Sequence, residues 1–233
     1  MIPTYVVIPV KDQLHLTHSL ITQLHTYGGY EEIFIFDNGS GEETRTYLTR
    51  LAAHPHHRVR VFLRSNSTIY QMWNEGWLTA LQAAAICNIA FLNNDIVICE
   101  DFLQTLAKAL RSDPRLWCVY PNYHRRIAEG RDPALGVTYT EGTYRHGGMC
   151  GWAFMIKGEA HTLGGLPLID NRFYWWCGDD DLAFQIQRRG YKIGRVNGLP
   201  VDHLGEASIP CHSELHRIKW EDMARFKAKY GDI

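Results

Sequence analysis

Short apolar runs alternate with helical patterns through the first hundred residues, and this alternation constrains the fold more than any other feature. The apolar runs, each typical of a buried strand, lie at 5–10, 33–36, 58–63 and 88–92. Between them, apolar spacing and turn residues predict helices at 16–28, 42–53 and 70–85. Helical crossovers between strands predict an α/β fold, a doubly wound and mostly parallel sheet with helices on both faces.

The second half of the chain is less regular. It predicts a helix at 101–111, a strand at 116–120, an aperiodic polar stretch at 122–144, a strand at 150–156, and helices at 181–189 and 213–230. No repeat or linker divides the chain, so we expect one domain over 1–233, with halves at 1–100 and 101–212 and a C-terminal helix at 213–233. The stretch 122–144 and the chain after Gly205 are predicted to close as lids.

Composition excludes several classes of protein. The 233 residues are 45% apolar and 21% charged, which is ordinary for a globular domain, and the net charge of −1 provides no basic field for nucleic acid or anionic lipid. The first residues predict a strand rather than a signal peptide, and the apolar stretch 83–99 contains too many polar residues to form a transmembrane segment. Six cysteines without a CxxC pair indicate reduced thiols and a cytoplasmic location.

Polar clusters follow two of the predicted strands. Asp37 begins one cluster, and Asn93, Asn94 and Asp95 form the other. Ligands of doubly wound sheets bind beyond the carboxyl ends of the strands, where both clusters lie. A carboxylate at this place can hold a hard cation through oxygen, while the amides bond a sugar or a ribose. A plain polar turn at the strand end is the alternative interpretation.

Three consecutive acids, Asp179, Asp180 and Asp181, form a third cluster, directly after Trp175 and Trp176. Neighbouring carboxylates repel one another, which raises at least one pKa unless a cation or a helix N-terminus is near. Helix capping explains one of the acids equally well. Aromatic faces beside carboxylates nevertheless suit the apolar faces of a sugar ring and help to tune a general base.

His203 is a further candidate, in the segment Val-Asp-His-Leu-Gly that follows a predicted strand. A lone histidine is more often structural than a ligand, and the chain has twelve of them. The histidines at 54, 56 and 57 indicate a solvated loop. His203 differs because it follows two acidic clusters in an α/β chain.

The order of these motifs resembles that of family-2, inverting glycosyltransferases with the GT-A fold, over about 3–208. VVIPVKDQ is similar to the opening strand of the family, DNGS at 37–40 to its nucleotide-base motif, and FLNNDI at 91–96 to its metal motif in rhamnosyltransferase-like members. Asn66 and Asn74 have the spacing of its Asn…Asn-x-Gly segment. GMCGWAFMIK at 148–157, DDDLAFQIQRRGYKIG at 179–194 and HLGEAS at 203–208 resemble its acceptor-side strand, catalytic-acid segment and trailing histidine motif.

The resemblance implies roles for the matching residues. Asp95 would coordinate Mn²⁺ or Mg²⁺ on the diphosphate of the donor, with His203 as a second candidate ligand. Asp179 would be the general base, with Asp180 as its rival. The expected nucleotide-sugar-binding residues, mostly in the nucleotide-binding half 1–100, are Pro9, Asp37, Asn66, Asn74, Asn93 and Asn94. The expected wall beside the acceptor and the sugar, in the acceptor and catalytic half, consists of Trp152, Trp175 and Trp176.

Three positions depart from the family pattern. Asn93 stands where many members have an Asp, which weakens the expected hold on the cation. Gly178 replaces the acid that usually precedes the catalytic Asp, so the role of Asp180 stays open. Gln185 stands where an Arg is common, and 122–144 has no counterpart.

The resemblance implies a hexosyltransferase-type enzyme that moves a sugar, with inversion, from a UDP-, dTDP- or GDP-sugar to a hydroxyl of an acceptor. The acceptor stays open among a protein, a glycan, a small molecule and a modified nucleic-acid base. A sugar-1-phosphate nucleotidyltransferase is one alternative, although the expected glycine-rich triphosphate loop is absent from 10–13. A non-catalytic nucleotide-sugar or carbohydrate-binding relative is the other, and it would not need Asp95, Asp179 and His203 together.

Overall fold

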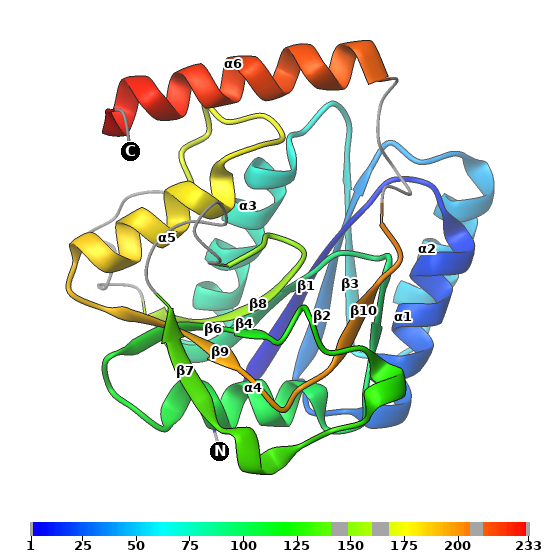
Figure 1. The fold of residues 1–233 in the computed structure, drawn as a ribbon. Coiled ribbons are helices and arrows are strands. Elements are labelled where there is room, and N and C mark those ends of the chain that lie inside the picture. The colour runs from blue at the N-terminus through cyan, green and yellow to red at the C-terminus, as the bar shows by residue number, and fades with distance from the viewer. Residues whose placement is uncertain (1, 141–148, 160–167, 206–211, 232–233) are drawn as a thin grey trace.

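An eight-stranded sheet forms the centre of the protein in the computed structural model, which describes residues 2–140, 149–159, 168–205 and 212–231 (Figure 1). The strand order is β3-β2-β1-β4-β8-β6-β9-β7. The strands are β1 (Thr4–Val10), β2 (Glu32–Asn38), β3 (Val59–Arg64), β4 (Ile86–Leu92), β6 (Leu116–Pro121), β7 (Val137–Thr140), β8 (Ala153–Glu159) and β9 (Lys192–Val196). Only β8 and β7 run against the common direction, so the prediction of a mostly parallel sheet is confirmed.

Six α-helices accompany the sheet in the described ranges: α1 (Leu14–Tyr27), α2 (Glu42–Ala53), α3 (Ile69–Ala83), α4 (Phe102–Arg111), α5 (Gly178–Arg188) and α6 (His212–Tyr230). Local sequence signals set several of their ends. Gly28 closes α1 with a φ of 65°, which glycine adopts without strain. Thr68 and Gln71 form a reciprocal capping box that begins α3.

The two faces of the sheet have separate cores. Val6, Ile8 and Val10 of β1 belong to a core that includes residues of α1, α2 and α4. Tyr5 and Val7, which alternate with them, belong to a second core with α3 and α5. Because successive residues of a strand point to opposite faces, this division places helices on both sides of the sheet. The doubly wound, single α/β domain is therefore confirmed.

The second half differs from expectation in several elements. The stretch predicted as an aperiodic loop contains two 3₁₀ turns, η1 (Ile127–Glu129) and η2 (Pro133–Leu135), and the edge strand β7, which pairs antiparallel with β9. The lid prediction is thus wrong for β7, because that segment is part of the sheet. It is also wrong for 212–230, which form the helix α6 instead of a loop, and the parts of the predicted lids at 141–144, 206–211 and 232–233 lie outside the described residues. Strand β8 begins three residues later than predicted, at Ala153, and α5 begins three residues earlier, at Gly178.

Helix α6 crosses the end of the molecule above α5 and α3 (Figure 1). Its buried residues include Ile218 and Asp222, and Phe226 packs against the core on the α3 and α5 side. No helix among the described residues is long and apolar enough to cross a membrane. Within the same residues no cysteine forms a disulfide bond, and Cys211 lies outside them.

Candidate functional site

The carboxyl ends of β1, β2 and β4 lie side by side, because β1 pairs with both of the others. Asp37, near the end of β2, is only 1% exposed and accepts a hydrogen bond from the Ser40 amide at 3.2 Å. The Asp12 amide donates to Ser40 Oγ at 2.7 Å, and the Gly41 amide donates to Asp12 Oδ1 at 2.7 Å. These bonds join the β1–α1 and β2–α2 loops into one polar edge beside Asp37.

Asp95 and His203 are brought together by a small second sheet. Strand β5 (Ile96–Ile98) pairs antiparallel with β10 (Val201–His203), with His203 opposite Ile96. The Leu204 amide also donates to the Asp95 carbonyl at 2.9 Å. As a result, His203 Nε2 lies 3.2 Å from Asp95 Oδ1, although the two residues are far apart in sequence. The Trp152 ring stacks on the His203 imidazole, with centroids 4.5 Å apart and planes at 6°.

The residues around Asp95 fit a divalent cation. In the described part of the protein, Asn93 Oδ1 is buried without a hydrogen-bond partner, and the 3.2 Å contact of the buried Asp95 Oδ1 with His203 Nε2 lacks hydrogen-bond geometry. Oxygen ligands with one imidazole nitrogen suit Mn²⁺ or Mg²⁺. No group of three or more His, Cys, Asp or Glu side chains in these residues could enclose an ion. A cation held by Asp95, Asn93 and His203 would therefore need further ligands besides these three side chains.

Asp179 lies in the first turn of α5 and is partly buried. Its Oδ2 accepts a hydrogen bond from the Gly151 amide at 2.9 Å, and its Oδ1 accepts one from the Asp180 amide at 3.1 Å. Burial, together with the negative charge of Asp180, raises the pKa of Asp179 from its ordinary value of 3.8 to about 7. A carboxyl group with such a pKa can take and release a proton near neutral pH, as a general base must.

The other two acids of the cluster have different surroundings. Asp180 is 9% exposed, and its charge acts on Asp179. Asp181 is fully buried and accepts hydrogen bonds from Lys229 Nζ and Tyr230 Oη of α6, both at 2.6 Å. The Asp170 amide donates to it as well, at 3.0 Å. Asp181 is therefore a structural acid, which connects α5 with α6.

Gly178 has a steric explanation that the sequence did not provide. A Cβ atom at this position would lie 2.2 Å from the Tyr70 ring. Tyr70 in turn donates from its hydroxyl to the Trp175 carbonyl at 2.9 Å, so the ring is held in place. The acid that the family pattern places at 178 has no room here, which leaves Asp179 and Asp180 as the acids nearest the helix start.

Residues 151 and 152 connect the two sides of the site. Gly151 contacts Asp179 through its amide, while Trp152 stacks on His203 and accepts a hydrogen bond from the Asn93 amide at 2.9 Å. A Cβ atom at Gly151 would lie 2.9 Å from the Trp73 ring, so only glycine allows this close approach. The segment thus connects Asn93 and His203 with Asp179 through one continuous set of contacts.

The remaining predicted residues have varied surroundings. The Asn74 amide bonds Ile169 and Asn171, so its donor and acceptor atoms are occupied inside the protein. Asn94 donates to Thr17 Oγ1 at 3.0 Å and is 8% exposed. Asn66 is exposed, with a φ of 58°, in the turn before α3. Pro9 is partly exposed in β1, and Trp175 and Trp176 are partly buried beside α6.

Sequence reasoning missed Asp12, Tyr70 and Gly151. All three act through contacts with residues at least 28 positions away in the chain, which no local pattern reveals. A signal did exist for Gly151, because an isolated glycine inside a strand pattern indicates close backbone approach.

Comparisons with known proteins give a family and a shared fold. The family model described as glycosyl transferase family 2 matches residues 2–151. Glucosyl-3-phosphoglycerate synthase from Mycobacterium tuberculosis, solved with Mn²⁺, UDP and glucosyl-3-phosphoglycerate, has a TM-score of 0.62 and 17% identity, over 99% of this chain and 81% of that one. Its complex with Mg²⁺ and UDP gives the same score and identity, over 99% and 80% of the chains. A mannosyltransferase from Pyrobaculum calidifontis, solved with GDP-mannose and Mn²⁺, has a TM-score of 0.61 and 16% identity, over 100% and 77%.

No curated protein sequence matches the chain. At 16–17% identity the solved structures show the fold alone, and they confirm the expected GT-A architecture.

Proposed function

Because the chain belongs to glycosyl transferase family 2 and is a glycosyltransferase, we propose that it transfers a sugar with inversion and with the help of a divalent cation. The donor in this proposal is a nucleoside-diphosphate sugar, and the acceptor provides a hydroxyl group. Residues 1–100 form the nucleotide-binding half and 101–212 the acceptor and catalytic half.

One observation supports this proposal most. Trp152 stacks on His203, which lies beside Asp95, and the neighbouring Gly151 donates a hydrogen bond to Asp179. Glycosyl transfer with inversion needs two groups in this relation. One side must stabilise a departing diphosphate, and the other must accept a proton from the attacking hydroxyl.

On the donor side, Asp37 and the loops joined to it would contact the nucleoside, and Asp95, His203 and Asn93 would hold Mn²⁺ or Mg²⁺. When bound, the cation would supply charge to neutralise the departing diphosphate. The stacked Trp152 ring keeps His203 in one orientation and excludes water from that face. Asn94 would act indirectly, because its amide is bonded to Thr17.

On the acceptor side, Asp179 would take the proton of the attacking hydroxyl. The hydroxyl oxygen forms a bond to C1 of the sugar while the bond from C1 to the diphosphate oxygen breaks, which inverts C1. The Gly151 and Asp180 amides hold the carboxylate of Asp179 in one orientation, so the base is positioned before the acceptor arrives. Trp175 and Trp176 would provide part of the wall for the acceptor.

The proposal leaves open which donor sugar and which class of acceptor the enzyme uses. The solved neighbours contain UDP, UDP-glucose or GDP-mannose, so UDP-glucose and GDP-mannose are the first donors to test. The acceptor classes remain a protein, a glycan, a small molecule or a modified base.

Membership of the family excludes the alternative function of a sugar-1-phosphate nucleotidyltransferase. The cytoplasmic location stays part of the proposal.

The test is a screen of UDP-, dTDP- and GDP-sugars for binding and slow hydrolysis, with Mn²⁺, with Mg²⁺ and with EDTA. A matching donor should raise the melting temperature only when metal is present, because a ligand of the folded state stabilises it by mass action. The same donor should be hydrolysed, and EDTA should abolish the reaction. Binding without any turnover would favour the non-catalytic relative, and full turnover in EDTA would contradict the metal role.

A further inference from the structure

The turn that precedes Asp179 is held by one buried carboxylate of the C-terminal helix. Asp222 of α6 is fully buried, and its two oxygens accept hydrogen bonds from three consecutive backbone amides, those of Tyr174, Trp175 and Trp176. The distances lie between 2.8 and 3.1 Å. Arg225 Nη1 bonds the same carboxylate at 2.7 Å. Asp222 thus fixes the backbone of residues 174–176, which we call the aromatic turn.

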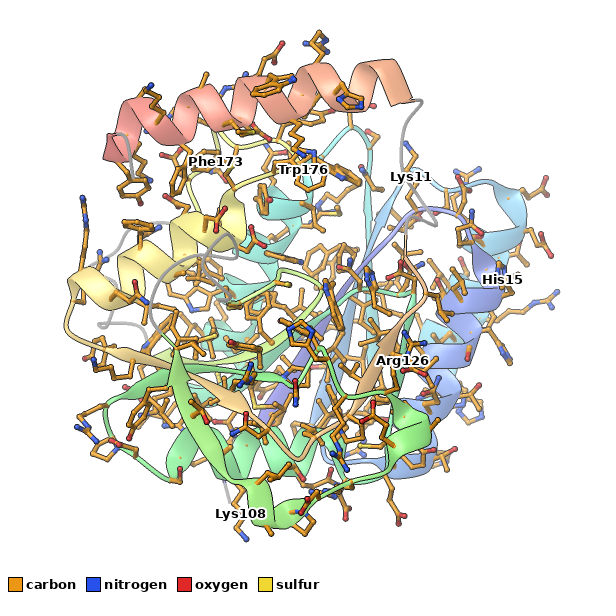
Figure 2. All side chains as sticks on the ribbon, in the orientation of Figure 1. Lys11, His15, Lys108, Arg126, Phe173 and Trp176 are labelled. Carbon is orange, nitrogen blue, oxygen red and sulfur yellow. The ribbon has the colours of Figure 1, made fainter. Side chains whose placement is uncertain are left out.

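Other contacts hold the aromatic turn and α6 against each other. Lys219 lies over the Trp176 ring at 5.1 Å, and the rings of Phe173 and Phe226 are 6.2 Å apart. Phe173 and Trp176 lie on the side of α6 that faces the body of the protein (Figure 2). From the opposite side, the Tyr70 hydroxyl bonds the Trp175 carbonyl. The aromatic turn is therefore held between α3 and α6.

The path from the aromatic turn to Asp179 is short and stiff. Cys177 follows with a φ of 65°, in the left-handed region that a residue with a side chain rarely adopts, and α5 begins at the next residue. Such a conformation persists only where surrounding contacts impose it. Asp222 supplies three of the hydrogen bonds on the upstream side of this strained residue. A shift of the aromatic turn must therefore move Asp179.

We propose that Asp222 is a positioning residue, which acts through the aromatic turn to place the carboxylate of Asp179 for proton transfer. The inference rests on the proposed role of Asp179 as the base. Under this proposal, a residue of α6 contributes indirectly to catalysis. The family match ends at residue 151, so α5 and α6 lie in the part of the chain that this match does not cover.

The physical basis is the sensitivity of proton transfer to geometry. A displacement of about 1 Å in a reacting group can cost about a hundredfold in rate, while donor binding at the strand ends is unaffected. Asp222→Asn keeps the shape of the side chain but replaces one acceptor oxygen by an NH₂ group, which faces amide donors it cannot bond. The aromatic turn should loosen, and α6 should stay folded through its apolar contacts.

The experiment compares wild type, Asp222→Asn and Glu221→Gln. Hydrolysis of UDP-glucose and of GDP-mannose is measured with Mn²⁺, together with donor affinity and with amide hydrogen exchange across 168–182. Asp222→Asn should lose about tenfold or more in turnover, keep donor affinity within about twofold, and exchange faster at the aromatic turn. Glu221→Gln removes the same charge one residue away, from a side chain paired with Arg217 and Arg225, and should match wild type.

A second variant protects the test against misfolding of Asp222→Asn. Tyr70→Phe removes only the oxygen that bonds the Trp175 carbonyl, and it should speed exchange at the aromatic turn and lower turnover by about threefold. Native turnover in either variant, despite faster exchange at 174–176, would overturn the proposal. Unchanged exchange in a folded Asp222→Asn would also overturn it. Amide exchange needs no donor, so it tests the Asp222 contact even if the wild type is inactive. A wild type that hydrolyses none of the UDP-, dTDP- and GDP-sugars would refute the proposed function separately.

Discussion

Asp95 and Asp179 are both carboxylates of the proposed site, but their surroundings differ in a way that separates their roles. Asp95 has a buried oxygen without a hydrogen bond, next to the His203 imidazole. Asp179 accepts one backbone hydrogen bond on each oxygen, and burial beside Asp180 raises its pKa to about 7. In the proposed roles, the first carboxylate would contact a cation, and the second, already oriented by its hydrogen bonds, would accept a proton from the acceptor. The two residues are of the same type, so their different proposed roles follow from their surroundings.

The largest effect is expected at Asp95. Asp95→Ala should remove the metal-dependent gain in donor affinity and lower turnover by about a thousandfold, because the cation supplies several kcal/mol of charge stabilisation. Donor binding measured by calorimetry, with Mn²⁺ and with EDTA, checks this. Asp101→Asn is the control, since that acid is exposed and makes only a 3.5 Å contact with Arg131. Metal-dependent donor binding by Asp95→Ala would show that Asp95 does not hold the cation, which would contradict the role that separates it from Asp179.

Asp179→Asn should show the reverse pattern. Turnover should fall by at least about a hundredfold, the lower range for general-base catalysis, while donor affinity stays near native. Asp180→Asn is the rival experiment, because the acid usually found at Gly178 is missing. If Asp180→Asn is inactive and Asp179→Asn turns over normally, the base is one residue further along the helix.

The regular half of this fold was predictable because its signals are local. Helix α2 has the predicted bounds, and β1 to β4 alternate with helices as expected. Strand β7 was missed because its four residues follow a segment rich in turns, and it becomes a strand only by pairing with β9 at the sheet edge. The start of α5 was predicted three residues too late. The residue that precedes the helix as its N-cap is Cys177, in a left-handed conformation, whereas the sequence suggested that an Asp caps the helix.

The candidate site shows the same difference between residues with local sequence signals and contacts that depend on distant segments. Asp95 and Asp179 could be predicted from residue type and place, as acids at a strand end and at a helix start. The contact of His203 with Asp95 depends on β5 and β10, two three-residue strands too short to leave a pattern. The occupied amide of Asn74 and the tight packing of Gly178 against Tyr70 also depend on distant segments. Sequence indicated the candidate groups, and the fold shows which of them already form hydrogen bonds inside the protein.

The pH dependence tests the raised pKa of Asp179. The base must be ionised, so turnover should fall about tenfold between pH 8 and pH 6 if its pKa is about 7. The free energy of unfolding should change in the opposite direction and increase between pH 8 and pH 6. Because the folded pKa lies above the unfolded value, the folded state binds the extra proton between these values, and the ionised group costs stability above pH 7. Asp179→Asn should thus raise the melting temperature at pH 8, with a gain that shrinks towards pH 4. A pH-independent gain would contradict the assignment.

The smallest effect on turnover is expected at Asp181, two residues from the base. Asp181→Asn removes a buried charge that accepts hydrogen bonds from Lys229 and Tyr230, so it should cost about 2 kcal/mol and lower the melting temperature by about 4–8 °C. Turnover per folded molecule, measured well below that melting temperature, should stay within about twofold of wild type. Tyr230→Phe, which removes one of these bonds, should give a smaller loss of stability in the same direction. A hundredfold loss of turnover in a stable Asp181→Asn would show that the whole acidic run takes part in proton transfer, and Asp179 would lose its separate role.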